Sequence, residues 1–178
     1  MKRNWLVNIT IATMVVLLAG CGSTPKKPKI ETTSQFHVDA INVRIIQNHD
    51  PEIEYHSKDE LSSMVKNLLI NKLEKKGLLS DAPEMDRITI NIDYRRRFVG
   101  GDTPIPSDSL AYPTFKYDVQ TIKNEQSVKL INRGKLVYNG GFAMNLQVMA
   151  GGLRDKSYEN KFVEAIANTI TKDIDELN

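Results

Sequence analysis

The feature that most constrains the fold is an alternation of apolar and polar residues between positions 87 and 98, interrupted at Arg96. Successive side chains of a β-strand point to opposite faces, so this pattern predicts a strand with one buried face. The apolar side chains all occupy even positions: Ile88, Ile90, Ile92, Tyr94 and Phe98.

Two segments instead show helical periodicity. Ser57 and Glu60 form an S-x-x-E capping box, apolar residues follow at helical spacing, and Gly77 offers a left-handed stop. A second helix is predicted over residues 157–177. Its expected buried stripe comprises Phe162, Val163, Ile166, Ile170, Ile174 and Leu177.

The sequence pattern predicts further short strands outside the two helices. Residues 36–47 predict a first strand whose alternation changes phase after Ala40, which is typical of a β-bulge. Asn132-Arg133-Gly134 and Asn139-Gly140-Gly141 are hairpin-turn signals. Further strands are expected at 115–119, at 128–130 (a continuation of 115–119 or a separate strand), at 135–138 and at 142–148.

These elements predict an α+β fold in the order β-α-β-β-β-β-α. The hairpin signals favour an antiparallel sheet of about four to six strands, with the two amphipathic helices on one face. No internal repeat or heptad pattern is evident in the sequence.

The N-terminus has the pattern of an export signal. Lys2 and Arg3 precede an apolar run, Trp5 to Leu18, which at 14 residues is shorter than the roughly 20 residues of a spanning helix. Leu18-Ala19-Gly20-Cys21 resembles the lipobox of bacterial lipoproteins. The resemblance implies cleavage before Cys21 and acylation of that cysteine, palmitate included. Gly22, where an aspartate would favour inner-membrane retention, implies the periplasmic face of the outer membrane.

The alternative, an uncleaved anchor or buried strand with an accidental cysteine, explains Cys21 less well. Cys21 is the single cysteine of the chain, so no internal disulfide can use it. The predicted organisation is therefore a cleaved signal over 1–20, a lipidated cysteine and flexible tether over 21–35, and one domain over 36–178. The element order of this domain also loosely resembles that of small periplasmic α+β lipoproteins.

Charge argues against nucleic acid as a partner. The chain has 24 basic and 22 acidic residues, and two of the basic residues belong to the signal. The chain after cleavage, 158 residues long, is therefore electrically balanced. Nucleic-acid binding normally relies on a basic surplus.

His49 and His56 delimit the densest set of possible metal ligands, which includes three carboxylates. Zinc sites more often use cysteine pairs or histidines four residues apart on a helix. A polar loop leading to the helix cap explains these residues, so the sequence predicts no metal site and no cofactor.

Arg95, Arg96 and Arg97 interrupt the strand with three cations. Alternation places Arg95 and Arg97 on the solvent face, where arginine forks suit phosphate or carboxylate groups, and Arg96 on the apolar face. The alternative is that Arg96 lies past the edge of the core and that all three arginines are solvated or paired.

Residues 100–113 predict a long proline-rich loop that is either functional or merely mobile. Leu110 and Tyr112 are its candidate partner anchors, because aromatic and apolar side chains often dominate interfaces.

No catalytic motif occurs: the sequence has no P-loop, no dinucleotide-binding glycine pattern and no G-x-S-x-G elbow. The sequence therefore favours a non-enzymatic lipoprotein that binds or assembles a protein component of the envelope. A small-ligand or lipid-binding protein with a cavity between sheet and helices is the first alternative. A hydrolase with a site built from distant residues is the second.

Overall fold

The computed structural model describes residues 30–123 and 125–178, with one folded unit over Glu31–Asn178. The predicted signal peptide, Cys21 and most of the predicted tether lie outside the described residues. The elements are β1 (Phe36–Ile46), α2 (Lys58–Lys75), β2 (Asp86–Phe98), β3 (Leu110–Lys123), β4 (Gln126–Val137), α3 (Gly141–Met149) and α4 (Ser157–Asp175).

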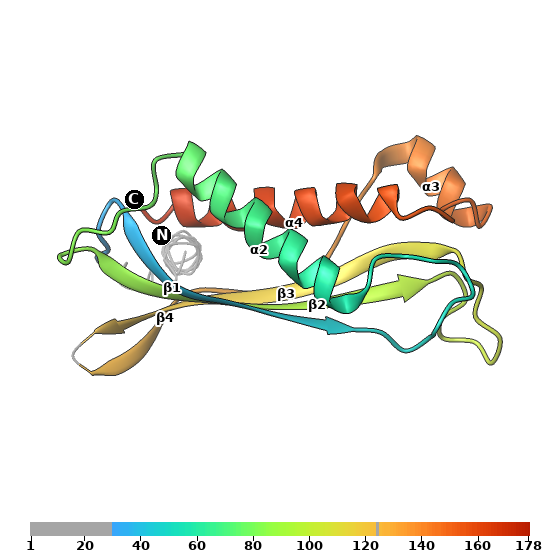
Figure 1. Cartoon of the computed structure of the whole chain (residues 1–178), viewed down its shortest axis with the longest axis horizontal. Coiled ribbons are helices and arrows are strands. Elements are labelled where there is room, and N and C mark those ends of the chain that lie inside the picture. The colour runs from blue at the N-terminus through green and yellow to red at the C-terminus, as the bar shows by residue number, and fades with distance from the viewer. Residues whose placement is uncertain (1–29, 124) are drawn as a thin grey trace, which may run out of the picture. The chain divides into compact units, whose positions relative to one another are not determined.

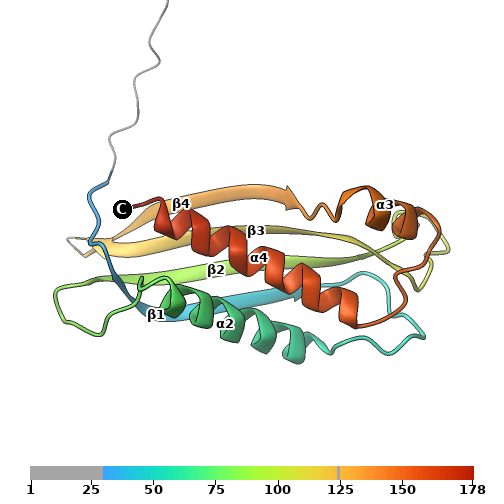
Figure 2. The same ribbon diagram turned by 90° about the horizontal axis from the view of Figure 1, so that it is seen from above.

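The predicted α+β class is confirmed. The four strands form one sheet in the order β1-β2-β3-β4, and α2 and α4 lie side by side over one face of it (Figures 1 and 2). Among residues 30–123 and 125–178, no helix lies on the opposite face of the sheet (Figure 1). The sheet therefore has a buried face and an open face.

The sheet is mixed rather than antiparallel, which corrects the prediction. β1 pairs with β2 in parallel, whereas β2–β3 and β3–β4 are antiparallel. The reason is α2, because a helical crossover returns the chain to the same end of the sheet before β2 begins. The phase change in β1 is confirmed as a bulge between Val38 and Ala40.

The local signals of the first helix are confirmed. The Ser57 side chain accepts a hydrogen bond from the backbone N–H of Glu60, and the Glu60 carboxylate accepts one from the N–H of Ser57. Gly77 follows the helix with φ at +67°. Leu61, Val65, Leu69 and Leu73 form its buried stripe.

Several predicted details of the later strands are wrong. Residues 135–137 continue β4 instead of forming a strand of their own, and Asn139-Gly140-Gly141 leads into helix α3 instead of a hairpin. Asn132-Arg133-Gly134 is not a turn, because β4 runs through it, opposite Tyr117 and Asp118 of β3. The segment 142–148 is part of helix α3, not a strand. Its apolar residues alternate, but Met144 and Val148 are also four residues apart, and this helical pair is what packs inward.

The core consists of two clusters. The larger one fills the space between the sheet and α2 and α4, and it contains the even-numbered residues of β2 from Ile88 to Tyr94. The smaller one lies where β2 ends and comprises Tyr55, Phe98, Leu110, Leu153 and Phe162. The alternation of β2 thus serves both clusters along one strand.

Candidate functional site on the open face of the sheet

A carboxylate flanked by two cations stands at the centre of the open face. The pairing register places Asp93 of β2 between Arg44 of β1 and Lys116 of β3. Arg44 donates from Nε and Nη2 to the two carboxylate oxygens of Asp93, at 2.7 and 2.5 Å, and Lys116 Nζ lies 3.0 Å from Oδ2. The hydrogen bonds from Arg44 lower the pKa of Asp93 to about 2, although its partial burial opposes the shift.

A row of uncharged and acidic side chains lies beside this triad. Asn42 donates to Asn91 at 2.9 Å, and Asn91 donates to Asp118 at 3.0 Å, so a row of side-chain hydrogen bonds crosses three strands in addition to their backbone pairing. Such cross-strand pairs stabilise a sheet face that no helix covers. The open face is thus polar and ordered.

Next to the triad lies a concavity of about 520 Å³, here called the basic groove. It is lined by Arg44, Ile46, Asp93, Arg95, Arg97, Asp102, Thr114, Phe115, Lys116 and Lys135. These residues include five cations and two carboxylates, so the groove has a positive surplus.

The surplus resides in Arg95, Arg97 and Lys135. Arg95 and Lys135 form no ion pair within residues 30–123 and 125–178, and Arg97 reaches only the fully exposed Asp102, at 4.0 Å. Arginine and lysine without strong internal partners are free to bind an external oxyanion. The groove can therefore hold a phosphate or carboxylate group.

The candidate binding residues predicted from the sequence do not all lie in one place in the structure. Arg95 and Arg97 come together in the basic groove, as their position on the solvent face predicts. Leu110 does not join them, because it is 1% exposed and belongs to the smaller core cluster. Tyr112 packs against the rings of Tyr138 and Phe162, at centroid distances of 5.4 and 6.4 Å.

The partner-anchor role is therefore wrong for the buried Leu110, whereas for the half-buried Tyr112 it stays a prediction. β3 begins at Leu110, so the connection that follows β2 is shorter than the sequence predicts and both residues are part of the sheet. Backbone hydrogen bonds hold the two ends of the β2–β3 connection together. The N–H of Val99 donates to the carbonyl of Ser109, and the N–H of Ser107 donates to the carbonyl of Val99, both at 2.9 Å.

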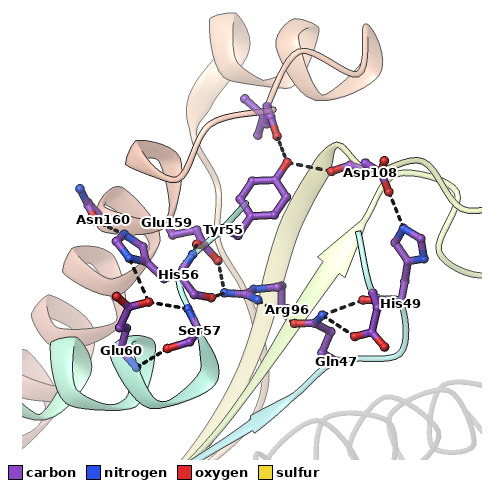
Figure 3. A network of polar contacts seen from close by, with 12 residues as sticks. Gln47, His49, Tyr55, His56, Ser57, Glu60, Arg96, Asp108, Glu159 and Asn160 are labelled. Atoms are coloured by element: carbon purple, nitrogen blue, oxygen red, sulfur yellow. Dashed lines mark hydrogen bonds and ion pairs between the residues drawn. The ribbon is translucent and has the colours of Figure 1, made fainter. Parts of the chain in front are cut away.

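Arg96 has a structural role that the sequence only partly indicates. Its predicted position on the apolar face is confirmed, but it does not lie past the core, since it is 5% exposed. Its Nη2 atom lies 2.7 Å from Glu159 Oε1 of α4 and donates to the carbonyl of His56, while Nη1 donates to Gln47 (Figure 3). Glu159 Oε2 also accepts the backbone N–H of His56, at 3.0 Å.

Burial of Glu159 raises its pKa, and the neighbouring Arg96 opposes that shift. The carboxylate is fully buried and its partners are a guanidinium and a backbone amide, so it connects β2, the β1–α2 connection and α4. This group of contacts positions the chain around the basic groove without lining it.

The two histidines are not brought together. His49 pairs with Asp108 through Nε2 at 2.8 Å, and His56 Nε2 lies 3.2 Å from Asn160 Oδ1 (Figure 3). In the part of the chain that the structure describes, no group of three His, Cys, Asp or Glu side chains is placed to hold a metal ion.

Sequence reasoning missed Arg44, Asp93, Lys116 and Lys135. The alternation along each strand could have indicated them in part. Their neighbours in the sequence point inward, so these residues face the open side of the sheet. Which of them lie side by side depends on the register between strands, which the sequence did not reveal.

Comparison with known proteins assigns no family. No family model matches the chain, and no curated protein matches it. Among solved structures, a DUF330-family protein of Xanthomonas campestris is 15% identical, with 86% of this chain and 93% of that chain covered and a TM-score of 0.41.

Two further structures have similar or lower scores. A neuraminyllactose-binding hemagglutinin homologue of Helicobacter pylori is 14% identical, with 85% and 88% of the two chains covered and a TM-score of 0.39. Rare lipoprotein B of Shewanella oneidensis is 12% identical, with 75% and 98% covered and a TM-score of 0.20. These values are too low to transfer a function.

Among the described residues, none of the helices combines the length and apolar character needed to span a bilayer.

The buried ion pair gives a stability prediction. Glu159→Gln leaves the Arg96 guanidinium buried without a counter-charge, and such a change costs roughly 3–5 kcal/mol of the free energy of unfolding. Glu164→Gln is the matched control, because Glu164 lies on the same helix and pairs with Lys72, but its own side chain is 60% exposed. Denaturant unfolding measures both variants, and an equal effect of the two would refute the role of the pair.

The triad on the open face predicts a dependence on pH. The pKa of Asp93 falls from 3.8 to about 2 on folding, so its contribution to stability is complete above pH 3.8 and is lost as the pH falls towards 2. Asp93→Asn should cost about 1 kcal/mol at neutral pH and make the acid loss of stability less steep. Thermal unfolding across this range measures the slope, and an unchanged slope would contradict the assignment.

Proposed function

We propose that this chain is a lipid-anchored, non-enzymatic binding protein on the periplasmic face of the outer membrane. Its basic groove would hold an acidic segment of an envelope protein and help to assemble or stabilise that partner. The observation that supports this proposal is the charge of the groove, where five cations face two carboxylates on a polar, uncovered sheet face.

The chemistry of the groove favours an acidic partner over a neutral one. Arg95 and Arg97 are two residues apart on β2, so their side chains leave the same face of the strand from positions about 6–7 Å apart. This spacing suits two carboxylates of an extended segment. Asp93 cannot neutralise them, because both of its oxygens already accept from Arg44 and Lys116.

Binding at the surface is supported over binding in an internal cavity. The space between the sheet and α2 and α4 is filled by the larger core cluster. The residues best suited to acid–base chemistry all contact other side chains of the folded unit. His49 contacts Asp108, His56 contacts Asn160, and Glu159 contacts Arg96. These contacts support a binding role rather than a hydrolytic one.

In this proposal, the lipid anchor explains how the protein would bind its partner. Acylation of Cys21 would confine the folded unit near the membrane and raise its effective concentration around a membrane-associated partner. The groove would then need only modest affinity.

The anchor can be tested by Cys21→Ser. The variant should move from the outer-membrane fraction to the soluble or inner-membrane fraction, since it lacks the acceptor for the lipid. Fractionation with immunodetection measures the distribution, and loss of labelling by a palmitate analogue provides the second readout. A variant that stays in the outer membrane and remains labelled would exclude lipidation at Cys21.

The groove can be tested by crosslinking in cells. A photoreactive amino acid at Asp102, a fully exposed residue that lines the groove, should capture a distinct envelope protein identified by mass spectrometry. Arg95→Glu with Arg97→Glu should lower its yield about tenfold or more, because two favourable charges become repulsive.

Arg87→Glu is the matched control for this experiment. Arg87 is also an exposed arginine of β2, but it pairs with Asp39 and does not line the groove. An equal loss in the control and the groove variant, or no captured protein, would count against the proposed function.

A further inference from the structure

Helix α3 exposes an apolar stripe that the fold does not use. Phe142, Leu146 and Met149 are 80%, 50% and 81% exposed, and their spacing places them on one side of the helix. Met144 and Val148 occupy the other side and pack against the smaller core cluster. The helix is therefore apolar both towards the protein and towards solvent.

The sequence around α3 is also uncharged. Residues 136–153 contain no Asp, Glu, Lys or Arg, although charged residues make up 26% of the chain. A contiguous exposed apolar surface on an otherwise charged protein marks a contact site. The position of α3 is separate from the basic groove, since α3 lies on the helical side of the sheet (Figure 1).

The small size of the stripe argues against a stable protein interface. Three side chains present at most a few hundred Å², whereas a specific interface buries about 800 Å² per partner. Shallow insertion into a bilayer requires no such area, because a short helix with Phe and Leu on one face can enter the headgroup boundary. The dimensions thus favour a lipid surface over a second copy of the chain.

The charged residues that follow α3 indicate which lipid headgroups the helix would contact. Arg154, Lys156 and Lys161 are exposed, and none of them has an ion-pair partner in the described part of the chain. Asp155 is the exposed acid among them, while Glu159 is buried against Arg96. A net positive segment beside an apolar stripe complements anionic headgroups.

We propose that α3 is a membrane-contact helix that inserts Phe142, Leu146 and Met149 into an anionic bilayer surface, with Arg154 and Lys156 at the headgroups. This contact would be separate from the lipid anchor. The chain enters the folded unit where Thr33 binds Asp86 at the start of β2, whereas α3 packs on the cluster at the end of β2. The inference does not rest on the proposed function of the basic groove.

The test uses the folded unit, residues 31–178. This unit contains both core clusters and all four strands, so it is expected to fold without the preceding residues. The single tryptophan of the chain, Trp5, lies outside it, so Phe142→Trp introduces a fluorophore without background. Vesicles of phosphatidylglycerol with phosphatidylethanolamine should shift its emission to shorter wavelength, and neutral phosphatidylcholine vesicles should not.

Co-sedimentation with the same vesicles measures the contribution of each part. Leu146→Asp, and separately Arg154→Glu with Lys156→Glu, should each weaken binding about tenfold. Ile122→Asp is the matched control: Ile122 is 62% exposed, but it lies at the β3–β4 hairpin, and its change should leave binding unaltered.

Several results would overturn the proposal. An unshifted emission, or equal binding by wild type and Leu146→Asp, would exclude insertion. Loss of binding only in Arg95→Glu with Arg97→Glu would transfer the lipid contact to the groove. A concentration-dependent dimer in sedimentation velocity that Leu146→Asp abolishes would assign α3 to self-association instead.

Discussion

The buried pair of Arg96 and Glu159 is the interaction on which the arrangement of the surrounding chain depends. It joins β2 to α4, and through His56 it fixes the connection between β1 and α2. A buried guanidinium is costly unless it has a counter-charge and hydrogen-bond partners. Glu159, the His56 carbonyl and Gln47 supply them to the two Nη atoms of Arg96, so the pair favours this arrangement of the three segments. The basic groove begins one residue away on either side, at Arg95 and Arg97, so the pair holds the strand segment that carries both arginines.

The two faces of β2 have different roles. Even positions build the core, and odd positions build the open face, so a single strand supplies both the stability and the candidate binding surface. Asp93 organises the open face by holding Arg44 and Lys116 in place. This pairing leaves the positive surplus to Arg95, Arg97 and Lys135, which lie where an external acid can reach them.

The basic groove and the apolar stripe of α3 offer different chemistry on different sides of the sheet. In the proposals made for them, the groove would select oxyanions by charge, and α3 would gain free energy by removing apolar surface from water. A protein held at a membrane could engage an acidic partner and a lipid surface at once. Lipid contact by α3 would restrict the orientation of the groove, in addition to the distance set by an anchor.

The sequence by itself determined the α+β class, the capped first helix, the bulge in β1 and the inward face of β2, because local periodicity and capping chemistry decide these features. It also provided Arg95 and Arg97 as solvent-facing cations. Only the tertiary structure decided that β1 is parallel to β2, that residues 142–148 are helical, and that Leu110 is buried. Strand pairing and the burial of Met144 and Val148 arise from contacts distant in sequence. The neighbours of Arg95 and Arg97, and the pairing of Arg96 with Glu159 across 63 residues, follow from those same contacts.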